Sequence, residues 1–561
     1  MSGPFRSLAA VVSCPRLVVT LLGAAILTIS TGGPAPLAAE IAAASAASAA
    51  SAAPAPPGED RTAKPGESGG TKPPVSRVPD AAEKPVITKH TITVDGRKIG
   101  YQAEAGMLPL LKEDGAAKAS VFYVAYTLEP HDNGAAVPDA AAAGHHNEAA
   151  GHDAAVRPLI FCFNGGPGAS AVWLHLGGLG PRRAKVNDDG TLPPPPFGIV
   201  DNESTALLAA DLVFIDPVST GYSRAAKDEK PEQFFGKDPD IRAIAEFIRL
   251  YTTRHKRWRS PKYLCGESYG VFRAAGLASE LQDEHGMFLS GLVLVSGLVD
   301  FETIRTAACN DLPYAVFLPS FTAVAHFHKR LPPELQQDLP KAVAAARAFA
   351  GGDYATALFA GSALSAARRD QVAEQLAQFT GLPREFVLEH DLRVEPEAFR
   401  KQLLAKERLI CGRFDGRITG RDGDPAATAP AFDPSYTAAL GPLASVMNAY
   451  VREELGFESD VPYRVLAGVS PWSFDQNAYA SMSRELSDAL ARNPHLRVLV
   501  QVGLCDLAVP GDSMRHSIDH LKIAPELLGN ISFAEYQSGH MMYLNLPDLK
   551  KLRTDLEAFI R

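Results

Sequence analysis

The sequence predicts an α/β protein with a mostly parallel central sheet and a large helical insertion, and two observations lead to this prediction. Short, continuously apolar and mostly β-branched runs recur along the chain and alternate with segments of helical spacing. Strands buried on both faces of a parallel sheet covered by helices have this pattern. In addition, residues 303–470 contain mainly amphipathic helical segments and few strand-like runs. We interpret them as an insertion into the sheet domain.

Length and charge narrow the possible classes of function. The chain has 561 residues, 46% of them hydrophobic, which is enough for a large globular core. Its formal net charge is −9, so it lacks the basic surface excess that is typical of nucleic-acid binding. We therefore expect no nucleic-acid partner.

The first residues have the order of a secretory signal. Arg16 precedes the apolar run 17–29, and the small residues Ala38 and Ala39 follow it. This run is shorter than the ~20 residues that a comfortable transmembrane helix needs. We therefore expect residues 1–39 to be a cleaved signal peptide, and the protein to be secreted or periplasmic without stable membrane insertion after cleavage. An uncleaved anchor is the alternative.

Two other segments lack the composition of a core. Residues 40–84 are rich in alanine, serine and proline with almost no large apolar side chains, which is typical of a disordered tether. Residues 131–153 gather histidines in an alanine- and glycine-rich stretch without the fixed spacing of a metal site. We expect a solvated hairpin loop there, with a histidine metal site as the alternative, and no cofactor in the protein.

The cysteines are sparse for a secreted chain. Cys14 would leave with the signal, and an odd number remains, so at least one thiol is unpaired within the monomer. Cys162 and Cys265 lie in apolar strand-like runs, where a buried free thiol is expected. Cys309 and Cys411 are the one pair that we consider for a disulfide.

The first part of the core, residues 85–302, is expected to open with antiparallel strands. HTITVDGRKIGYQAEA and ASVFYVAYTLEP alternate polar and apolar residues, with a turn signal at Asp95 and Gly96. The buried strands are expected in RPLIFCFNGG, ADLVFIDP, KYLCGES and SGLVLVSG, and the second part of the core, residues 471–561, adds HLRVLVQVG. The helices are expected in IRAIAEFIRLYTTRH and VFRAAGLASELQDEHG. The insertion 303–470 is expected to be a helical cap or lid over the C-terminal edge of the sheet.

A serine between two glycines, GESYG at 266–270, marks the candidate reactive residue. The strand-like KYLC precedes it and a helical segment follows it. In that context G-x-S-x-G is the nucleophile elbow of α/β-hydrolases, in which a strained turn exposes the serine hydroxyl at the edge of the sheet. We therefore expect the α/β-hydrolase fold with Ser268 as nucleophile; an ordinary glycine-rich turn is the alternative.

A serine hydroxyl needs a base, and the base needs an orienting acid. In this fold the chain order is serine, then aspartate or glutamate, then histidine. Asp506 follows HLRVLVQVG and His540 follows the strand-like ISFAEYQ, so both lie just past the carboxyl ends of expected strands. We interpret Asp506 as the orienting carboxylate and His540 as the general base; a structural core histidine is the alternative.

The oxyanion hole is expected from an earlier strand and loop, FCFNGGPGASAVW. Gly165 and Gly166 let backbone N–H groups approach a substrate closely, and Pro167 and Gly168 fix the turn. A tight loop would explain these residues by themselves. Together with the serine, aspartate and histidine in the expected order, they favour a catalytic site.

These motifs resemble the serine carboxypeptidase family, peptidase family S10. The resemblance is carried by NGGPGAS at 164–170, IDPVSTGYSR at 215–224, GESYG at 266–270, the aspartate in VGLCDLAVP and GHMMY at 539–543. NDLPYAVFLPS, GRFDGRITG and FDPSY resemble the bacterial branch in particular. The resemblance extends from about residue 85 to the C-terminus.

The resemblance implies roles for individual residues. Ser268 would be the nucleophile, His540 the general base and acid, and Asp506 the orienting carboxylate. The backbone N–H groups of Gly166 and Tyr269 would form the oxyanion hole.

The resemblance also implies a site for the substrate's chain end, made by Asn164, Gly165 and Glu267. Asn164 and Glu267 would hydrogen-bond the C-terminal carboxylate of a peptide. Glu267 donates to that carboxylate only when it is protonated, so acidic conditions are expected to favour peptide binding.

The chain departs from the family in three places. Ala169 stands where many eukaryotic members have cysteine, so their disulfide framework does not transfer. Gly178 stands where members commonly have a glutamate. The chain therefore lacks an acidic group that would contact the substrate carboxylate, and this loss affects both the strength of C-terminal recognition and the preference for acid pH. Ser219 replaces a more usual glycine.

We therefore expect a cofactor-free serine carboxypeptidase that acts on peptides with a free C-terminus through an acyl-enzyme. An esterase or acyltransferase on the same fold is the alternative, because the triad acts on any acyl group. A hydrolase fold retained as a non-catalytic binding module is the third possibility.

Overall fold

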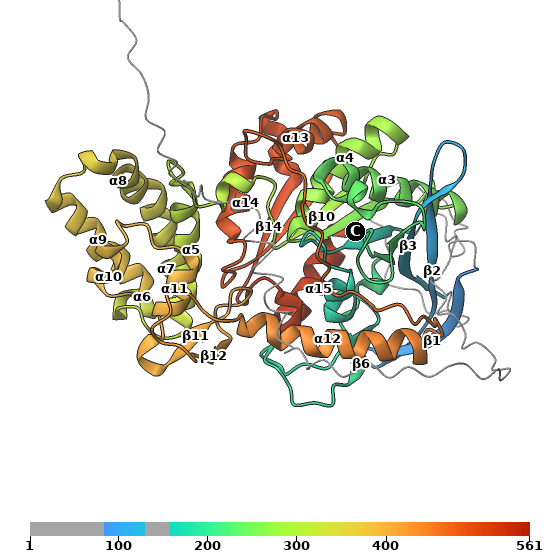
Figure 1. Ribbon diagram of the computed structural model, residues 1–561, viewed down its shortest axis with the longest axis horizontal. Coiled ribbons are helices and arrows are strands. Elements are labelled where there is room, and N and C mark those ends of the chain that lie inside the picture. Colours follow the sequence, from blue (N-terminus) through green and yellow to red (C-terminus); the bar gives the residue numbers. More distant parts are fainter. Residues whose placement is uncertain (1–83, 130–156) are drawn as a thin grey trace, which may run out of the picture.

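A sheet of ten strands lies at the centre of the computed structural model, which describes residues 84–129 and 157–561 (Figure 1). In spatial order its strands are β1 (Val86–Val94), β2 (Arg97–Leu111), β3 (Ala117–Leu128), β7 (Asp211–Ile215), β4 (Leu159–Phe163), β9 (Lys262–Glu267), β10 (Gly291–Val295), β13 (Arg497–Gly503) and β14 (Ile531–Tyr536), with β8 (Arg224–Ala225) beside β3. The neighbours from β7 to β14 pair in parallel. The predicted mostly parallel sheet is confirmed.

The signal peptide expected at 1–39 and the histidine-rich loop 131–153 lie outside the described residues. So does the expected tether 40–84, apart from its last residue. Among the helices that are described, none is long and apolar enough to cross a membrane.

The antiparallel opening is confirmed. β1 pairs with β2 in a register that places Val94 opposite Arg97, so the connecting turn is Asp95 and Gly96. Both turn residues have positive φ, 49° and 75°, as a two-residue hairpin requires. β3 then pairs antiparallel with β2 and with β7, which joins this ribbon to the parallel part of the sheet.

Helices cover both faces of the sheet with separate hydrophobic clusters. One cluster contains side chains of α3 (Lys237–Arg254), α4 (Tyr269–His285), α13 (Ser483–Arg492) and α14 (Gly511–Asp519). The other contains side chains of α2 (Val172–Leu174), α12 (Pro434–Glu453) and α15 (Leu546–Ile560). Small two-stranded sheets are formed by β5 (Arg182–Ala184) with β6 (Ile199–Asp201), and by β11 (Leu409–Cys411) with β12 (Thr419–Arg421).

The chain between β10 and β13 builds a helical block with its own core, which includes Val324, Leu376 and Phe399. Its helices are α5 (Leu312–Phe327), α6 (Pro333–Gln336), α7 (Leu339–Phe349), α8 (Ala355–Ala360), α9 (Ala366–Thr380), α10 (Arg384–Glu389) and α11 (Pro396–Gln402). In Figure 1 this block stands beside α14 and the β14 edge of the sheet, and α5 contacts α14. α12 belongs instead to a cluster of the sheet domain.

The disulfide considered between Cys309 and Cys411 is wrong. Both thiols are free, as are those of the other described cysteines. Cys411 lies on β11 and is buried in the core of the helical block, whereas Cys309 is exposed. Burial raises the pKa of the Cys411 thiol to about 12, so this thiol behaves as a small apolar side chain.

Candidate active site

Ser268 lies in the turn between β9 and α4, as the nucleophile-elbow motif predicts. Its φ of 60° and ψ of −126° put a non-glycine residue in a sparsely populated region, and such strain is concentrated at functional sites. The two flanking glycines are required by close backbone contact. A Cβ on Gly266 would lie 2.1 Å from the Gly270 carbonyl oxygen, and one on Gly270 would lie 2.8 Å from the Phe163 oxygen.

Asp506 and His540 come together past the ends of β13 and β14. His540 Nδ1 lies 2.7 Å from Asp506 Oδ2, and both side chains are buried. The other carboxylate oxygen, Oδ1, accepts from the backbone N–H groups of Ala508 and Val509 at 2.7 and 2.9 Å. These two amides fix the carboxylate, so that Oδ2 is aimed at the imidazole and favours a proton on Nδ1.

The hydroxyl of Ser268 makes no hydrogen bond with any described residue. The other imidazole nitrogen, His540 Nε2, lies 3.9 Å from Oε1 of Glu267, the residue that precedes the serine. In the structure the aspartate and the histidine are therefore in contact, but the histidine and the serine hydroxyl are not hydrogen-bonded to each other. In enzymes without substrate such contacts are often long, and they tighten in the Michaelis complex.

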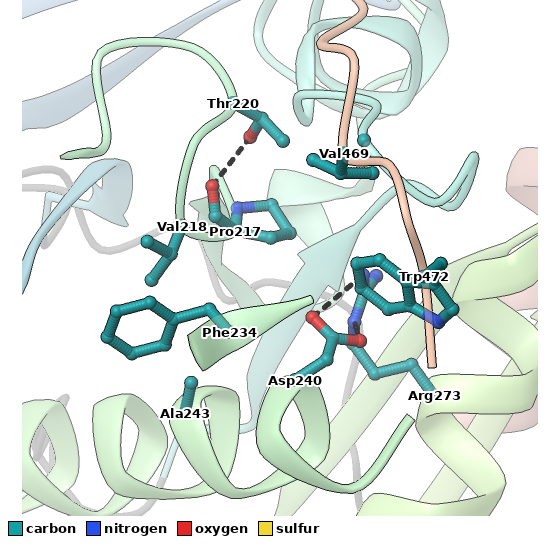
Figure 2. Close-up of a pocket in the computed structure, with 10 residues that line it drawn as sticks. Pro217, Val218, Thr220, Phe234, Asp240, Ala243, Arg273, Val469 and Trp472 are labelled. Atoms are coloured by element: carbon teal, nitrogen blue, oxygen red, sulfur yellow. Dashed lines mark hydrogen bonds and ion pairs between the residues drawn. The ribbon is translucent and has the colours of Figure 1, made fainter. Parts of the chain in front are cut away.

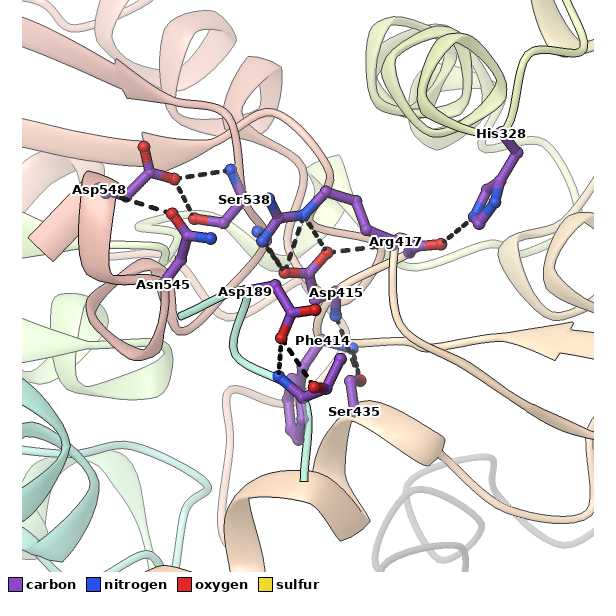
Figure 3. Close-up of polar contacts among 12 residues, drawn as sticks. Asp189, His328, Phe414, Asp415, Arg417, Ser435, Ser538, Asn545 and Asp548 are labelled. Atoms are coloured by element: carbon purple, nitrogen blue, oxygen red, sulfur yellow. Dashed lines mark hydrogen bonds and ion pairs between the residues drawn. The ribbon is translucent and has the colours of Figure 1, made fainter. Parts of the chain in front are cut away.

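A loop that precedes α12 holds His540 in place. The ring of Phe414 stacks on the imidazole with centroids 5.0 Å apart, and the His540 N–H donates to the Phe414 carbonyl at 2.6 Å. Asp415 Oδ2 accepts from the Gly539 N–H at 3.1 Å. It also accepts from the guanidinium of Arg417 at 2.7 Å (Figure 3). A Cβ on Gly539 would lie 2.1 Å from the Phe414 oxygen. This explains why glycine precedes the histidine.

Burial and nearby charged groups set the protonation of His540. Burial and the Arg413 guanidinium lower its pKa, but the carboxylates of Asp506 and Glu267 outweigh them, so the pKa is raised above its usual value. The imidazole is therefore a stronger base here than in water. An imidazolium formed during a reaction would be stabilised in the same way.

The glycine loop after β4 lies against the start of α4. A Cβ on Gly165 would be 2.3 Å from the backbone nitrogen of Tyr269, and Gly166 has a φ of 99°. Neither Gly166 nor Tyr269 donates its N–H to any acceptor among the described residues. Two unengaged N–H donors beside the serine have the arrangement that an oxyanion hole needs.

Asn164 and Glu267 are joined to each other. Asn164 Nδ2 donates to Glu267 Oε2 at 2.5 Å, and the hydroxyl of Tyr543 donates to the same oxygen at 2.7 Å. Glu267 is buried, and burial raises its pKa to about 7 in spite of these two donors. A large part of this carboxyl is therefore protonated at neutral pH, and almost all of it in mild acid.

A narrow pocket adjoins the glycine loop, and Figure 2 shows its lining. Gly168, Phe234 and Trp472 line it, together with the buried ion pair of Arg273 Nε with Asp240 Oδ2 at 2.7 Å. Neither the candidate nucleophile nor the aspartate–histidine pair is part of this lining. Arg273 also donates to the Asn164 carbonyl at 2.6 Å, so the ion pair supports the backbone of the glycine loop.

Sequence reasoning gave no role to Phe414, Asp415 or Tyr543. All three lie in stretches that it had singled out, GRFDGRITG and GHMMY. The available signals were Tyr543, three residues after the histidine, and the aromatic–acid pair of Phe414 and Asp415 in the insertion. Neither signal identifies the residue that it contacts in the structure. These contacts join segments that are distant along the chain.

Residues 147–402 match the model of the family Serine carboxypeptidase (Peptidase_S10). The matched range contains Asn164 and Ser268 and ends before Asp506 and His540. No curated protein matches the sequence. The match supports a serine carboxypeptidase, an enzyme of the serine hydrolase class.

Several solved structures are similar to this chain at low sequence identity. A prohormone-processing carboxypeptidase from Saccharomyces cerevisiae is 17% identical with a TM-score of 0.49, covering 82% of this chain and 91% of its own. A proline iminopeptidase from Mycobacterium smegmatis is 14% identical with a TM-score of 0.33, covering 81% and 97%. A peroxisomal α/β-hydrolase from Saccharomyces cerevisiae is 10% identical with a TM-score of 0.29, covering 85% and 90%.

Proposed function

We propose that the protein is a serine carboxypeptidase that releases the C-terminal residue of peptides through an acyl-enzyme intermediate. The family match over residues 147–402 supports this activity. The observation that carries the proposal is a buried acid beside the nucleophile: Glu267 adjoins Ser268 and is held by Asn164 at 2.5 Å. A protonated acid at this place can donate to the free carboxylate at a peptide's chain end, a group that an ester substrate lacks.

In the proposed reaction Ser268 Oγ attacks the carbonyl carbon of the last peptide bond. His540 Nε2 takes the hydroxyl proton as the new C–O bond forms, and Asp506 holds the imidazole in the tautomer that accepts it. The N–H groups of Gly166 and Tyr269 stabilise the oxyanion. His540 then gives the proton to the leaving amine as the C–N bond breaks, and a water activated by the same histidine hydrolyses the ester.

The specificity for a chain end would come from Asn164 and Glu267, with Gly165 allowing close backbone approach. The protonated carboxyl of Glu267 donates a hydrogen bond to the terminal carboxylate, whereas its ionised form repels that carboxylate. Because the pKa of Glu267 is about 7, peptide binding is expected to weaken as pH rises through neutrality. A C-terminal amide cannot form the same charge-assisted hydrogen bond.

The test compares N-blocked dipeptides as free acids, as C-terminal amides and as methyl esters, at acidic and neutral pH. We expect the free acids to exceed the amides in kcat/KM by at least about 100-fold, because a charge-assisted hydrogen bond is lost. Ser268→Ala should abolish turnover of all three. Equal turnover of amides, or turnover of esters alone, would overturn the carboxypeptidase and favour an esterase or acyltransferase.

The non-catalytic binding module would be favoured instead if Ser268 failed to react with a serine-directed phosphonate.

From the charged, apolar and small-residue order at 1–39 we further propose that the protein is secreted or periplasmic. The motifs NDLPYAVFLPS, GRFDGRITG and FDPSY support a place in the bacterial branch of the family.

A further inference from the structure

Tyr543 contacts Glu267, although sequence reasoning assigned this tyrosine no role. It lies in the short 3-10 helix η9 (Met542–Leu544), directly after the loop that carries His540. Its side chain is fully buried, and its hydroxyl donates to Glu267 Oε2 at 2.7 Å. Two segments of the site, the one with the base and the one with the nucleophile, are therefore linked by this hydrogen bond.

The two oxygens of Glu267 have different surroundings. Oε2 receives both Asn164 Nδ2, at 2.5 Å, and the Tyr543 hydroxyl. A carboxyl oxygen has two acceptor sites, so Oε2 has no room for a proton of its own. Oε1 accepts no hydrogen bond within the described residues and lies 3.9 Å from His540 Nε2. When Glu267 is protonated, its proton must therefore sit on Oε1, the oxygen that faces the base.

Two glycines fix the tyrosine ring in this position. A Cβ on Gly177 would lie 2.5 Å from Tyr543 Cε2, and a Cβ on Gly178 would lie 2.5 Å from Tyr543 Cβ. Both glycines belong to the π-helix η1 (His175–Leu179) and are buried. Any larger side chain at 178 would push the tyrosine away, so the glycine at this position and the tyrosine at 543 go together.

We propose that Tyr543 is a positioning residue for Glu267: by occupying Oε2 together with Asn164, it makes Oε1 the only oxygen that donates to a substrate's terminal carboxylate. This inference rests on the proposed carboxypeptidase function. It adds a residue that decides which oxygen of Glu267 contacts the C-terminal carboxylate of the substrate.

The tyrosine also affects the pH at which the acid ionises. A hydrogen bond donated to a carboxylate stabilises its charged form, so Tyr543 lowers the pKa of Glu267 against the larger effect of burial. The other titratable groups facing Glu267 are His540, which lowers its pKa, and Asp506 behind the histidine, which raises it. The thiol of Cys265, on the same strand, faces Tyr543.

The test uses Tyr543→Phe, which removes the hydroxyl and keeps the ring between the glycines. The matched control is Tyr123→Phe, because Tyr123 is also buried and donates its hydroxyl to another buried glutamate, Glu104, on the antiparallel part of the sheet. For both variants kcat/KM is measured against pH with a free-acid dipeptide and with an N-blocked amino-acid ester. The ester has no terminal carboxylate and therefore does not need a protonated Glu267.

We expect Tyr543→Phe to move the alkaline limb of the free-acid profile upward by about one pH unit, since a hydrogen bond to a charged group is lost. The alkaline side of the ester profile should stay in place, and Tyr123→Phe should match the wild type on both substrates. An unchanged free-acid profile would overturn the inference. An equal shift on the ester would also overturn it, because the hydroxyl would then act on the base.

Infrared titration of the Glu267 carboxyl, with Glu267→Gln to identify the band, separates this inference from the proposed function. If no substrate is cleaved, the proposed function fails, but the band should still titrate about one pH unit higher in Tyr543→Phe than in wild type. If Tyr543→Phe does not fold, Gly178→Ala provides a second displacement of the tyrosine, and the same upward shift is expected. A band that titrates at the wild-type pH in the folded variant would overturn the inference.

Discussion

Phe414 and His540 stack with their ring centroids 5.0 Å apart, and the backbone N–H of His540 donates to the Phe414 carbonyl at 2.6 Å. Phe414 comes from the long chain segment between β10 and β13, whereas His540 follows β14. The same segment reaches the aspartate side of the site, because the Leu507 N–H donates to the Arg413 carbonyl at 3.0 Å. The inserted segment therefore forms one wall of the candidate active site.

Replacing the stacking ring should loosen the base without removing it. We expect Phe414→Leu to lower kcat by about 10- to 100-fold with a smaller change in KM, since a misplacement of about 1 Å at a catalytic group has an effect of this size. Phe349→Leu is the matched control, because Phe349 stacks on Tyr354 inside the helical block. Equal losses of kcat in the two variants would mean that the ring has only a structural role.

Asp506→Asn should disable the histidine by changing its tautomer. The asparagine oxygen would stay with the N–H groups of Ala508 and Val509, which donate to Asp506 Oδ1 at 2.7 and 2.9 Å. Its amide would then face His540 Nδ1 and force the proton onto Nε2. We expect kcat to fall by about 10⁴-fold with little change in the thermal unfolding temperature. Activity within tenfold of wild type would contradict the assigned role.

Glu267→Gln should remove the loss of peptide activity above neutral pH. The pKa of Glu267 is about 7, so the wild-type acid loses its proton, and its donor role, as pH rises through that value. Glutamine stays neutral, and with its oxygen held by Asn164 and Tyr543 its amide would face the substrate. The variant also lacks the negative charge that raises the pKa of His540. The acidic limb should therefore move to lower pH on both peptides and esters.

The measurement for Glu267→Gln is kcat/KM for a free-acid dipeptide over the range from mild acid to mild base. A profile that still falls through neutral pH in the variant would show that another group limits activity there. A profile that stays level, with ester turnover retained, agrees with Glu267 as the titrating group.

Asp216 is expected to destabilise the fold as pH rises. Its Oδ1 accepts from the N–H of Ala171 at 2.8 Å and from the hydroxyl of Tyr463 at 3.2 Å, while Oδ2 has no partner among the described residues. Burial raises its pKa to about 7. The unfolded state therefore ionises first, and stability is lost between about pH 4, the unfolded value, and the folded value.

Asp216→Asn should remove this pH dependence. We expect the free energy of unfolding in urea to fall by roughly 2 to 4 kcal/mol more in wild type than in the variant between acid and mildly basic pH. The variant keeps an oxygen for Ala171 and Tyr463. Parallel curves for the two proteins would mean that Asp216 is ionised in the folded state at all these values of pH.

The nucleophile turn could be predicted from sequence because its chemistry is local. Only glycine fits at 266 and 270, where a Cβ would meet backbone atoms at 2.1 and 2.8 Å, and a strand and a helix on either side can be recognised from their own residues. Asp506 and His540 could be placed because parallel strands end at one edge of the sheet. Their functional roles remain predictions.

The contacts that tune the site could not be predicted in this way. Tyr543 reaches Glu267 across 276 residues of sequence, and nothing in either neighbourhood identifies the other. The disulfide considered between Cys309 and Cys411 was wrong for the same reason. The burial of the Cys411 thiol and the exposure of the Cys309 thiol depend on how the helical block packs. Local patterns determine elements and turns, while long-range packing determines partners.

The most direct test of the central claim is the mass ladder of a longer peptide with a blocked N-terminus and a free C-terminus. The account predicts that products shorten one residue at a time from the C-terminus, and that Ser268→Ala leaves the peptide intact. Internal cleavage, or a ladder that persists in Ser268→Ala, would contradict it.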